Sequence, residues 1–219
     1  MPELTNVQND ASVTRIVPGS DQMIFLYQGK IGQLFLEPLD FVKLSGARSH
    51  NVTMFRDRLA SFYHGRLNGR WKNIEATLEG QRQLLSEHSH VTALHCAGTS
   101  QGGYAAILFG HHLKARTVHA FAPQTEIISL VTPASLKFFP EPHQDLSRLL
   151  SEHNGITEYH LYYAEGNDID TAHANRIAHC PGVSLHPLPG SSHSPFTHVE
   201  PADVLAGLFP ESKREDSKP

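Results

Sequence analysis

A serine surrounded by small residues is the part of this sequence best suited to covalent chemistry. Ser100 stands in the run GTSQGG at positions 98–103, which matches the pattern Gly-x-Ser-x-Gly. The run follows a segment expected to form a strand and opens a segment expected to form a helix. At such a turn, glycines two residues before and after the serine permit close backbone approach, and the hydroxyl is exposed above the sheet. We therefore predict that Ser100 is a nucleophile.

The same turn could instead be purely structural, or it could be a glycine-rich loop that binds phosphate. Against the second alternative, no lysine follows in the P-loop position and no GxGxxG pattern occurs. A helix that begins at Gln101 offers free backbone N–H groups and the positive end of its dipole to a developing oxyanion. We expect the Gln101 N–H to be one oxyanion donor. The Lys30 N–H, in the loop after the first parallel strand, is the expected second donor.

A nucleophilic serine needs a base that accepts its proton and a carboxylate that orients the base. In enzymes built on such a turn, the chain order is serine, then acid, then histidine. His193 follows the last predicted strand in the loop PGSSH, which makes it the preferred base. His198 is the alternative, whereas His186 falls inside that strand.

Three carboxylates follow the strand predicted over residues 158–164, in the run EGNDID. Asp168 lies nearest to the strand end among the aspartates. Asp170 begins a predicted helix, where its other role would be to cap the N-terminus. Glu165 is a third candidate. The residues themselves leave this choice open.

The chain is rich in histidine, with 16 residues, and histidine is a common metal ligand. A His-x-His pair at 88–90 and the adjacent histidines 111–112 have no cysteine or carboxylate partner at ligand spacing, and HExxH does not occur. We expect neither a metal nor a cofactor.

The predicted elements alternate between strand and helix, which favours a parallel sheet with right-handed crossovers and helices on both faces. Strands are expected at 23–28, 52–55, 91–97, 117–121, 158–164 and 183–188, and helices at 71–87, 101–113, 146–153, 171–179 and 201–209. The expected fold class is α/β, with one domain over 20–210 and a mostly parallel sheet of about six strands. Residues 1–19 are expected to be an N-terminal extension, and 211–219 a disordered tail.

The segment 123–143 interrupts this alternation with apolar residues and three prolines. Such an insertion in a compact domain is usually functional. We interpret it as a small cap, with Phe138 and Phe139 shaping a pocket for an acyl group; the alternative is a longer core connection. Arg56-Asp57, at the end of a predicted strand, could bind an anionic substrate or simply pack a loop.

Several short motifs resemble the α/β-hydrolase superfamily, and among its members a compact bacterial branch. They are a loop containing Phe41, FRD at 55–57, SQGGY at 100–104, FAPQ at 121–124 and Asp170 ahead of His173-Ala174. In that branch an aspartate precedes a His-Ala pair by three residues, so the resemblance implies Asp170 as the acid, with Asp168 as the alternative. The usual superfamily position, three residues after the loop glycine, holds Ile169 here. The superfamily includes esterases, thioesterases and peptidases, so the resemblance does not identify the substrate.

Composition narrows the expected partners to a small acyl substrate. The formal net charge of −4 gives no reason to expect nucleic acid. No apolar run approaches the roughly 18 residues of a membrane span. The N-terminus lacks the pattern of a signal peptide, and Cys96 and Cys180 are too few for a disulfide framework. These features predict a cytoplasmic protein and leave its oligomeric state unknown.

The predicted activity is that of a carboxylesterase-like serine hydrolase, which cleaves an ester-like acyl bond through a Ser-His-Asp triad. One alternative is an acyltransferase or thioesterase that acts on a carrier-bound or sugar-linked acyl group. The other is a hydrolase fold retained as a non-catalytic binding module.

Overall fold

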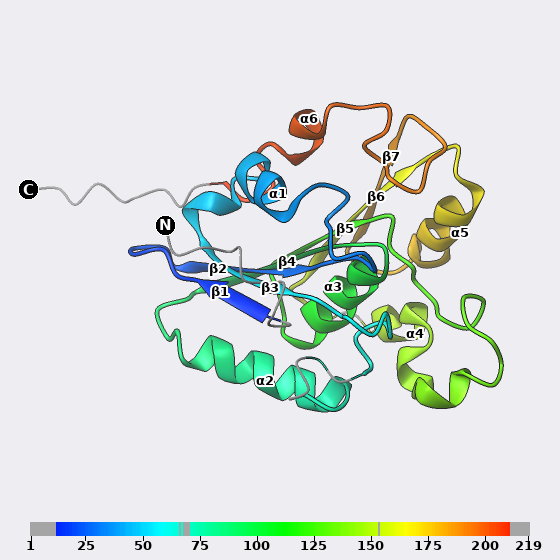
Figure 1. Ribbon diagram of the computed structural model, residues 1–219, viewed down its shortest axis with the longest axis horizontal. Coiled ribbons are helices and arrows are strands. Elements are labelled where there is room, and N and C mark those ends of the chain that lie inside the picture. Colours follow the sequence, from blue (N-terminus) through cyan, green and yellow to red (C-terminus); the bar gives the residue numbers. More distant parts are fainter. Residues whose placement is uncertain (1–11, 66, 68–70, 153, 211–219) are drawn as a thin grey trace, which may run out of the picture.

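A single sheet forms the centre of the molecule (Figure 1). The computed structural model describes residues 12–65, 67, 71–152 and 154–210. The strands in this part of the chain are β1 Ser12–Arg15, β2 Gln22–Tyr27, β3 Asn51–Phe55, β4 Ala93–Thr99, β5 Thr117–Phe121, β6 Glu158–Ala164 and β7 Val183–Leu188. Their order in the sheet is β1-β3-β2-β4-β5-β6-β7. All neighbours pair in parallel except β1, which runs antiparallel to β3.

The strand β1 lies within residues 1–19, which the sequence led us to expect as an extension, and it raises the expected six strands to seven. Its residues are partly exposed rather than continuously apolar, as suits the edge of a sheet. Arg15 Nη2 donates to three backbone carbonyls, those of Ala47, Arg48 and His50, each at 3.0 Å. These bonds hold the edge strand to the turn that precedes β3.

Helices cover both faces of the sheet, as expected. On one face lie α2 Ile74–Ser86, α3 Gln101–His112, α4 Leu146–Ser151 and α5 Asp168–Ile177, and on the other lie α1 Pro38–Leu44 and α6 Pro201–Leu205. Figure 1 shows α1 and α6 above the sheet and α2 and α4 below it. The strands β2 to β6 are mostly buried, which explains their apolar runs, whereas the edge strand β7 is partly exposed.

The segment 123–143 contains two short 3₁₀ turns, η3 Leu136–Phe138 and η4 Glu141–His143. Tyr104 of α3 donates its hydroxyl proton to the His143 carbonyl, and Ile127 is fully buried in the core. The segment is therefore attached to α3. Within the described residues, the helices are all too short or too polar to cross a membrane.

Candidate active site

Ser100 lies at a sharp turn between β4 and α3, in a backbone conformation that is rare for a residue with a side chain. Its φ is 55° and its ψ is −122°. The Ser100 N–H donates to the Phe121 carbonyl at 2.9 Å, which fixes the turn to the end of β5. This geometry projects the hydroxyl away from the sheet.

The glycines around Ser100 are required by backbone contacts. A Cβ at Gly98 would lie 2.1 Å from the carbonyl oxygen of Gly102, and a Cβ at Gly102 would lie 2.1 Å from that of Tyr27. Both distances are far below van der Waals contact, and the neighbours are backbone atoms that cannot rotate away. The close approach of α3 to β2 and β4 therefore depends on the glycines that flank the serine.

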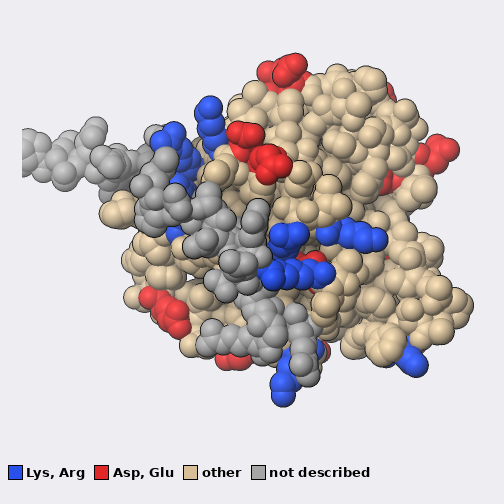
Figure 2. Space-filling view, viewed as in Figure 1, with Lys and Arg blue, Asp and Glu red and all other residues tan. Residues whose placement is uncertain are grey.

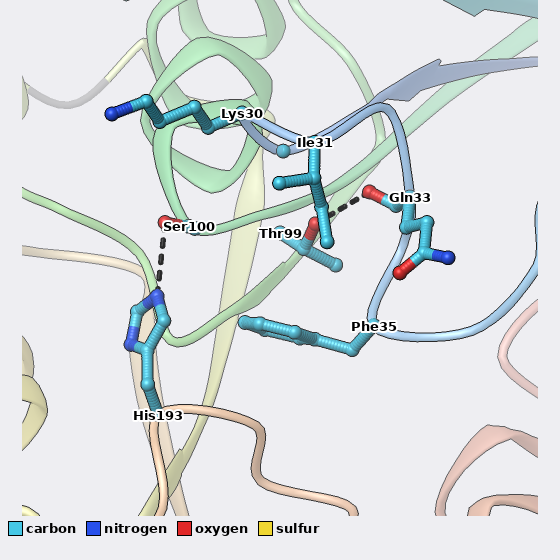
Figure 3. A pocket seen from close by; sticks show the side chains of 8 residues that line it. Lys30, Ile31, Gln33, Phe35, Thr99, Ser100 and His193 are labelled. Carbon is cyan, nitrogen blue, oxygen red and sulfur yellow. Dashed lines mark hydrogen bonds between the residues drawn. The ribbon is translucent and has the colours of Figure 1, made fainter.

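His193 contacts Ser100 directly. Its Nε2 lies 3.0 Å from Ser100 Oγ (Figure 3), and the side chain is 44% exposed. The edge of the imidazole packs against the ring of Phe35, with centroids 5.3 Å apart and planes at 87°. The alternative base, His198, instead packs against the loop backbone, where a Cβ at Gly190 would lie 2.6 Å from its Cδ2.

Asp170 completes a chain of hydrogen bonds with His193 and Ser100. His193 Nδ1 lies 2.9 Å and 3.0 Å from the two carboxylate oxygens of Asp170, which is only 2% exposed. Asn167 caps α5, because its side-chain oxygen accepts the Asp170 N–H at 3.0 Å. The Asp170 carboxylate is thus not needed as a helix cap and faces the histidine. Asp168 is exposed in the first turn of α5, and no hydrogen bond joins it to His193.

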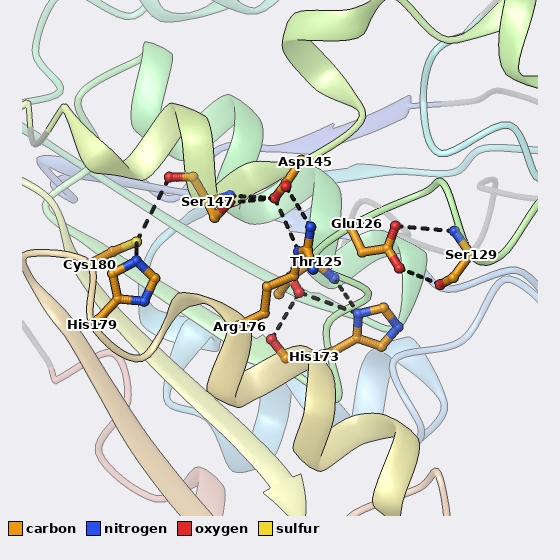
Figure 4. Close-up of polar contacts among 9 residues, drawn as sticks. All are labelled: Thr125, Glu126, Ser129, Asp145, Ser147, His173, Arg176, His179 and Cys180. Carbon is orange, nitrogen blue, oxygen red and sulfur yellow. Dashed lines mark hydrogen bonds and ion pairs between the residues drawn. The ribbon is translucent and has the colours of Figure 1, made fainter.

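Two hydrogen-bonded contacts hold the acid-bearing helix in place (Figure 4). The backbone N–H of Thr125 donates to His173 Nδ1 at 3.2 Å, and the Thr125 hydroxyl donates to the His173 carbonyl at 2.8 Å. Burial lowers the pKa of His173, which favours the neutral ring that can accept this bond. Arg176 pairs with Asp145 at 2.6 Å. The sequence signal for the contact between His173 and Thr125 was the position of His173, about one helical turn after Asp170.

The two predicted oxyanion donors, the backbone N–H groups of Gln101 and Lys30, lie at the start of α3 and in the loop after β2. Gln101 begins α3, where first-turn N–H groups have no acceptor within the helix. The loop carrying Lys30 is closed by the Gln33 carbonyl, which accepts the Gly29 N–H at 2.8 Å and the Thr99 hydroxyl at 3.2 Å. Both donor roles remain predictions.

A pocket of about 250 Å³ opens beside the serine (Figure 3). Its walls are formed by Gly29, Lys30, Ile31, Gln33, Phe35, Thr99, Ser100 and His193. Most of these residues come from the loop after β2, in which only Lys30 was predicted to belong to the site. Phe35 has a φ of 59°, an uncommon value for an aromatic residue that the sequence does not signal.

The predicted pocket residues Phe138 and Phe139 do not line this pocket. Phe139 is buried at 8% exposure against Phe62 and His64, because its ring fills a gap beside α3. Phe138 is 68% exposed, and Lys137 Nζ lies 5.1 Å from its ring centroid. The pocket beside Ser100 is lined mainly by the segment that follows β2.

The described part of the chain contains no cluster of side chains suited to binding a metal ion. No group of three histidine, cysteine, aspartate or glutamate side chains is arranged there to hold an ion. The hydrogen-bonded chain from Asp170 to Ser100 is suited to moving a proton, and the nearby helix N-terminus is suited to stabilising negative charge.

Comparison with known proteins identifies the fold through structure. No family model matches the sequence, and no curated protein is significantly similar to it. Among solved structures, a predicted CIB-like hydrolase from Thermoplasma acidophilum matches with a TM-score of 0.57 and 17% identity, over 89% of this chain and 87% of that one. Another similar structure belongs to a study of LipS and LipT, two metagenome-derived lipolytic enzymes. It matches with a TM-score of 0.61 and 11% identity, over 90% of this chain and 94% of that one.

A third similar structure is the capsule O-acetyltransferase of Neisseria meningitidis serogroup A, with a TM-score of 0.61 and 12% identity, over 85% of this chain and 86% of that one. The matches span nearly the whole length of both partners, and with 85% to 90% of this chain covered they extend over most of its mostly parallel sheet. The chain has the α/β-hydrolase fold.

Proposed function

We propose that this protein is a serine hydrolase that cleaves an ester-like acyl bond through an acyl-enzyme intermediate on Ser100. The single observation that carries the proposal is the continuous chain of contacts from buried Asp170 through His193 to Ser100, at 2.9 Å and 3.0 Å. A buried carboxylate, a histidine and a serine at a strained turn are the parts that general-base activation of a hydroxyl needs.

In the proposed mechanism, Ser100 Oγ attacks the substrate carbonyl carbon while His193 Nε2 accepts the hydroxyl proton. The Asp170 carboxylate stabilises the imidazolium and keeps its Nδ1 protonated. The oxygen that becomes negative is stabilised by the backbone N–H groups of Gln101 and Lys30. His193 then donates its proton to the leaving alcohol as the bond to carbon breaks. Water, activated by the same histidine, releases the acid and restores Ser100.

The size of the pocket favours short acyl groups. Its volume of about 250 Å³ lies just below the range of roughly 300–1,000 Å³ that pockets for drug-sized ligands span. Ile31, Phe35 and Thr99 contribute an apolar wall on the side of the pocket away from the Lys30 side chain (Figure 3). We expect butyryl and hexanoyl esters to be cleaved faster than decanoyl esters.

Pre-steady-state hydrolysis of 4-nitrophenyl butyrate tests the proposal. Wild type should release a burst of 4-nitrophenol equivalent to the enzyme concentration, followed by slower turnover, because this activated ester acylates the serine faster than water deacylates it. The burst should be absent in Ser100→Ala and in His193→Ala. Turnover that survives in Ser100→Ala at the wild-type rate would contradict the proposal.

Transfer to an acceptor other than water is a second candidate function. It is supported by the likeness to the capsule O-acetyltransferase and by the 44% exposure of His193, which leaves the proposed acyl-enzyme open to an incoming alcohol. Adding sugar alcohols to the butyrate assay discriminates the two. A transferase forms the sugar ester at the expense of butyric acid, whereas a hydrolase forms butyric acid alone.

A further inference from the structure

Lys30 lines the pocket, and Arg56 packs on the same loop at Gly32; within the described residues neither cation forms an ion pair. Lys30 is exposed, lines the pocket and extends over its Ser100 side in Figure 3. Arg56 is half-buried and directly follows β3, the strand paired with β2 on the side away from β4. The chain as a whole is acidic, with a formal net charge of −4.

Arg56 is packed onto the loop that carries Lys30. Gly32 has a φ of +78°, and a Cβ at this position would lie 2.6 Å from Arg56 Cζ. The guanidinium therefore lies against the backbone of Gly32, one residue after Ile31 in the pocket wall. The loops leave neighbouring strand ends, because Tyr27 of β2 is paired with Phe55 of β3.

Asp57 and Glu37, two acids near these cations in the sequence, accept hydrogen bonds from neutral groups. Asp57 is buried and accepts the backbone N–H groups of Leu59, Ser61 and Tyr63 at 3.1, 2.6 and 2.9 Å. Glu37 accepts Gln33 Nε2 at 2.8 Å and is not among the residues that line the pocket. Of the two interpretations of Arg56-Asp57, loop packing describes Asp57, and among the described residues Arg56 forms no ion pair with it or with another carboxylate.

Figure 2 shows several lysine and arginine side chains near the middle of the face in view, with an acidic side chain among them and other charged side chains toward the edges. An unpaired guanidinium presents fixed donors that suit carboxylate and phosphate, and an exposed ammonium adds a mobile charge. Two cations at one rim attract an anionic ligand and raise its local concentration.

We infer that the substrate of the Ser100 site carries a negative charge, as carboxylate or phosphate, which Lys30 and Arg56 bind at the rim of the pocket. This inference rests on the proposed function, since it names the substrate class of the same site. The charge can belong to the acyl part or to the leaving alcohol, and the two sources are separated by experiment.

The test compares each anionic ester with a neutral ester of matched shape. For the leaving group, 4-carboxyphenyl butyrate is compared with 4-carbamoylphenyl butyrate. For the acyl part, the 4-nitrophenyl monoester of adipic acid is compared with that of adipamic acid. We expect the ratio of kcat/KM, anionic over neutral, to be about tenfold in at least one pair at low salt. It should fall toward one at 0.5 M NaCl, because the Debye length shortens to a few ångströms.

Substitutions of Lys30 and Arg56 test whether these two cations cause the preference for anionic esters. The ratio should collapse in the double variant Lys30→Gln/Arg56→Gln, and it should be largely retained in Arg56→Lys, which keeps the charge. Lys43→Gln is the matched control, because this exposed lysine lies in the last turn of α1 as the chain returns to the start of β3. Its ratio should equal that of wild type. A wild-type ratio near or below one in both pairs overturns the inference.

Equilibrium binding to Ser100→Ala separates this inference from the proposed activity. Tighter binding of 4-carboxyphenyl butyrate or of the adipic monoester than of its amide, lost in the double variant, supports anion recognition even if wild type cleaves neither ester. Equal affinity for acid and amide in both pairs overturns it, whatever the turnover. An absence of turnover in wild type counts against the proposed function alone.

Discussion

Replacing Asp170 by asparagine removes one negative charge from the proposed proton-transfer chain while leaving the shape of the side chain almost unchanged. In the structure both carboxylate oxygens face His193 Nδ1, at 2.9 Å and 3.0 Å, and the group is 2% exposed. An amide can still accept from Nδ1–H through its oxygen. If its nitrogen faces the ring instead, it donates to Nδ1 and forces the proton to Nε2, where His193 can no longer accept the Ser100 proton.

The expected loss follows from the charge and its distance. A unit charge about 4 Å from the centre of the imidazolium is worth about 4 kcal/mol at an effective dielectric constant of about 20. At about 1.4 kcal/mol per tenfold change in rate, this is about three orders of magnitude. The wrong tautomer adds to the loss, so we expect kcat/KM to fall by about 10³ to 10⁴ in Asp170→Asn.

The assay is steady-state hydrolysis of 4-nitrophenyl butyrate at neutral pH, with thermal unfolding followed by circular dichroism to verify the fold. Asp168→Asn is the matched control, since Asp168 is exposed two residues away and has no hydrogen bond to His193. It should retain kcat/KM within about twofold. The reasoning is refuted if Asp170→Asn keeps more than a tenth of wild-type activity, or if Asp168→Asn loses as much.

Three further predictions concern stability. Gly102→Ala places a Cβ 2.1 Å from a carbonyl oxygen of β2, so urea unfolding should show a loss of about 3 kcal/mol or more; a loss below about 1 kcal/mol would contradict the packing of α3. Phe139→Ala should cost about 3 kcal/mol and Phe138→Ala less than about 0.5 kcal/mol, and equal costs would contradict their different burial. Burial lowers the pKa of His119 to about 3, so the unfolded chain binds more protons below pH 6.5 and stability falls as the pH drops from there toward 3. His119→Gln should reduce the decrease in unfolding free energy between pH 7 and 5 by about 2 kcal/mol, whereas exposed His90→Gln should leave it unchanged.

The sheet was predictable because its central strands are buried on both faces. Runs of strand-forming residues predicted β5 and β6 with their observed bounds and β2, β3 and β4 within two residues; the edge strand β7 was also predicted with its observed bounds, although it is only partly buried. The edge strand β1 was missed because half-exposed, short strands leave no such run. Helix α1, with only Phe41 and Val42 buried, was expected as a loop for the same reason.

The candidate site was predictable where chemistry and backbone geometry demand particular residue types. A strained turn between close-packed backbones requires glycine on both sides, so Ser100 stands out in the sequence. The choice between Asp168 and Asp170 depends on which residue caps α5, and Asn167 takes that role in the structure. From the residues alone this competition was open, and only a resemblance favoured Asp170.

The pocket wall was not predictable from residue type. Apolar residues at 138 and 139 suggested a binding surface, but one of these rings fills the core and the other is solvent-exposed. The wall comes instead from the loop after β2, whose course depends on positive φ values at Gly32 and Phe35 and on the carbonyl of Gln33. Tertiary contacts of this kind leave no periodic pattern in the sequence.

The central claim is that Ser100 is a nucleophile activated by His193, and covalent labelling with a fluorophosphonate tests it most directly. Such a probe reacts with activated serines, and mass spectrometry locates the modified peptide. Wild type should be labelled once, on Ser100, whereas Ser100→Ala should not react and His193→Ala should react at least about a hundredfold more slowly. A wild-type protein that stays unlabelled, or equal labelling of Ser100→Ala, would contradict the account.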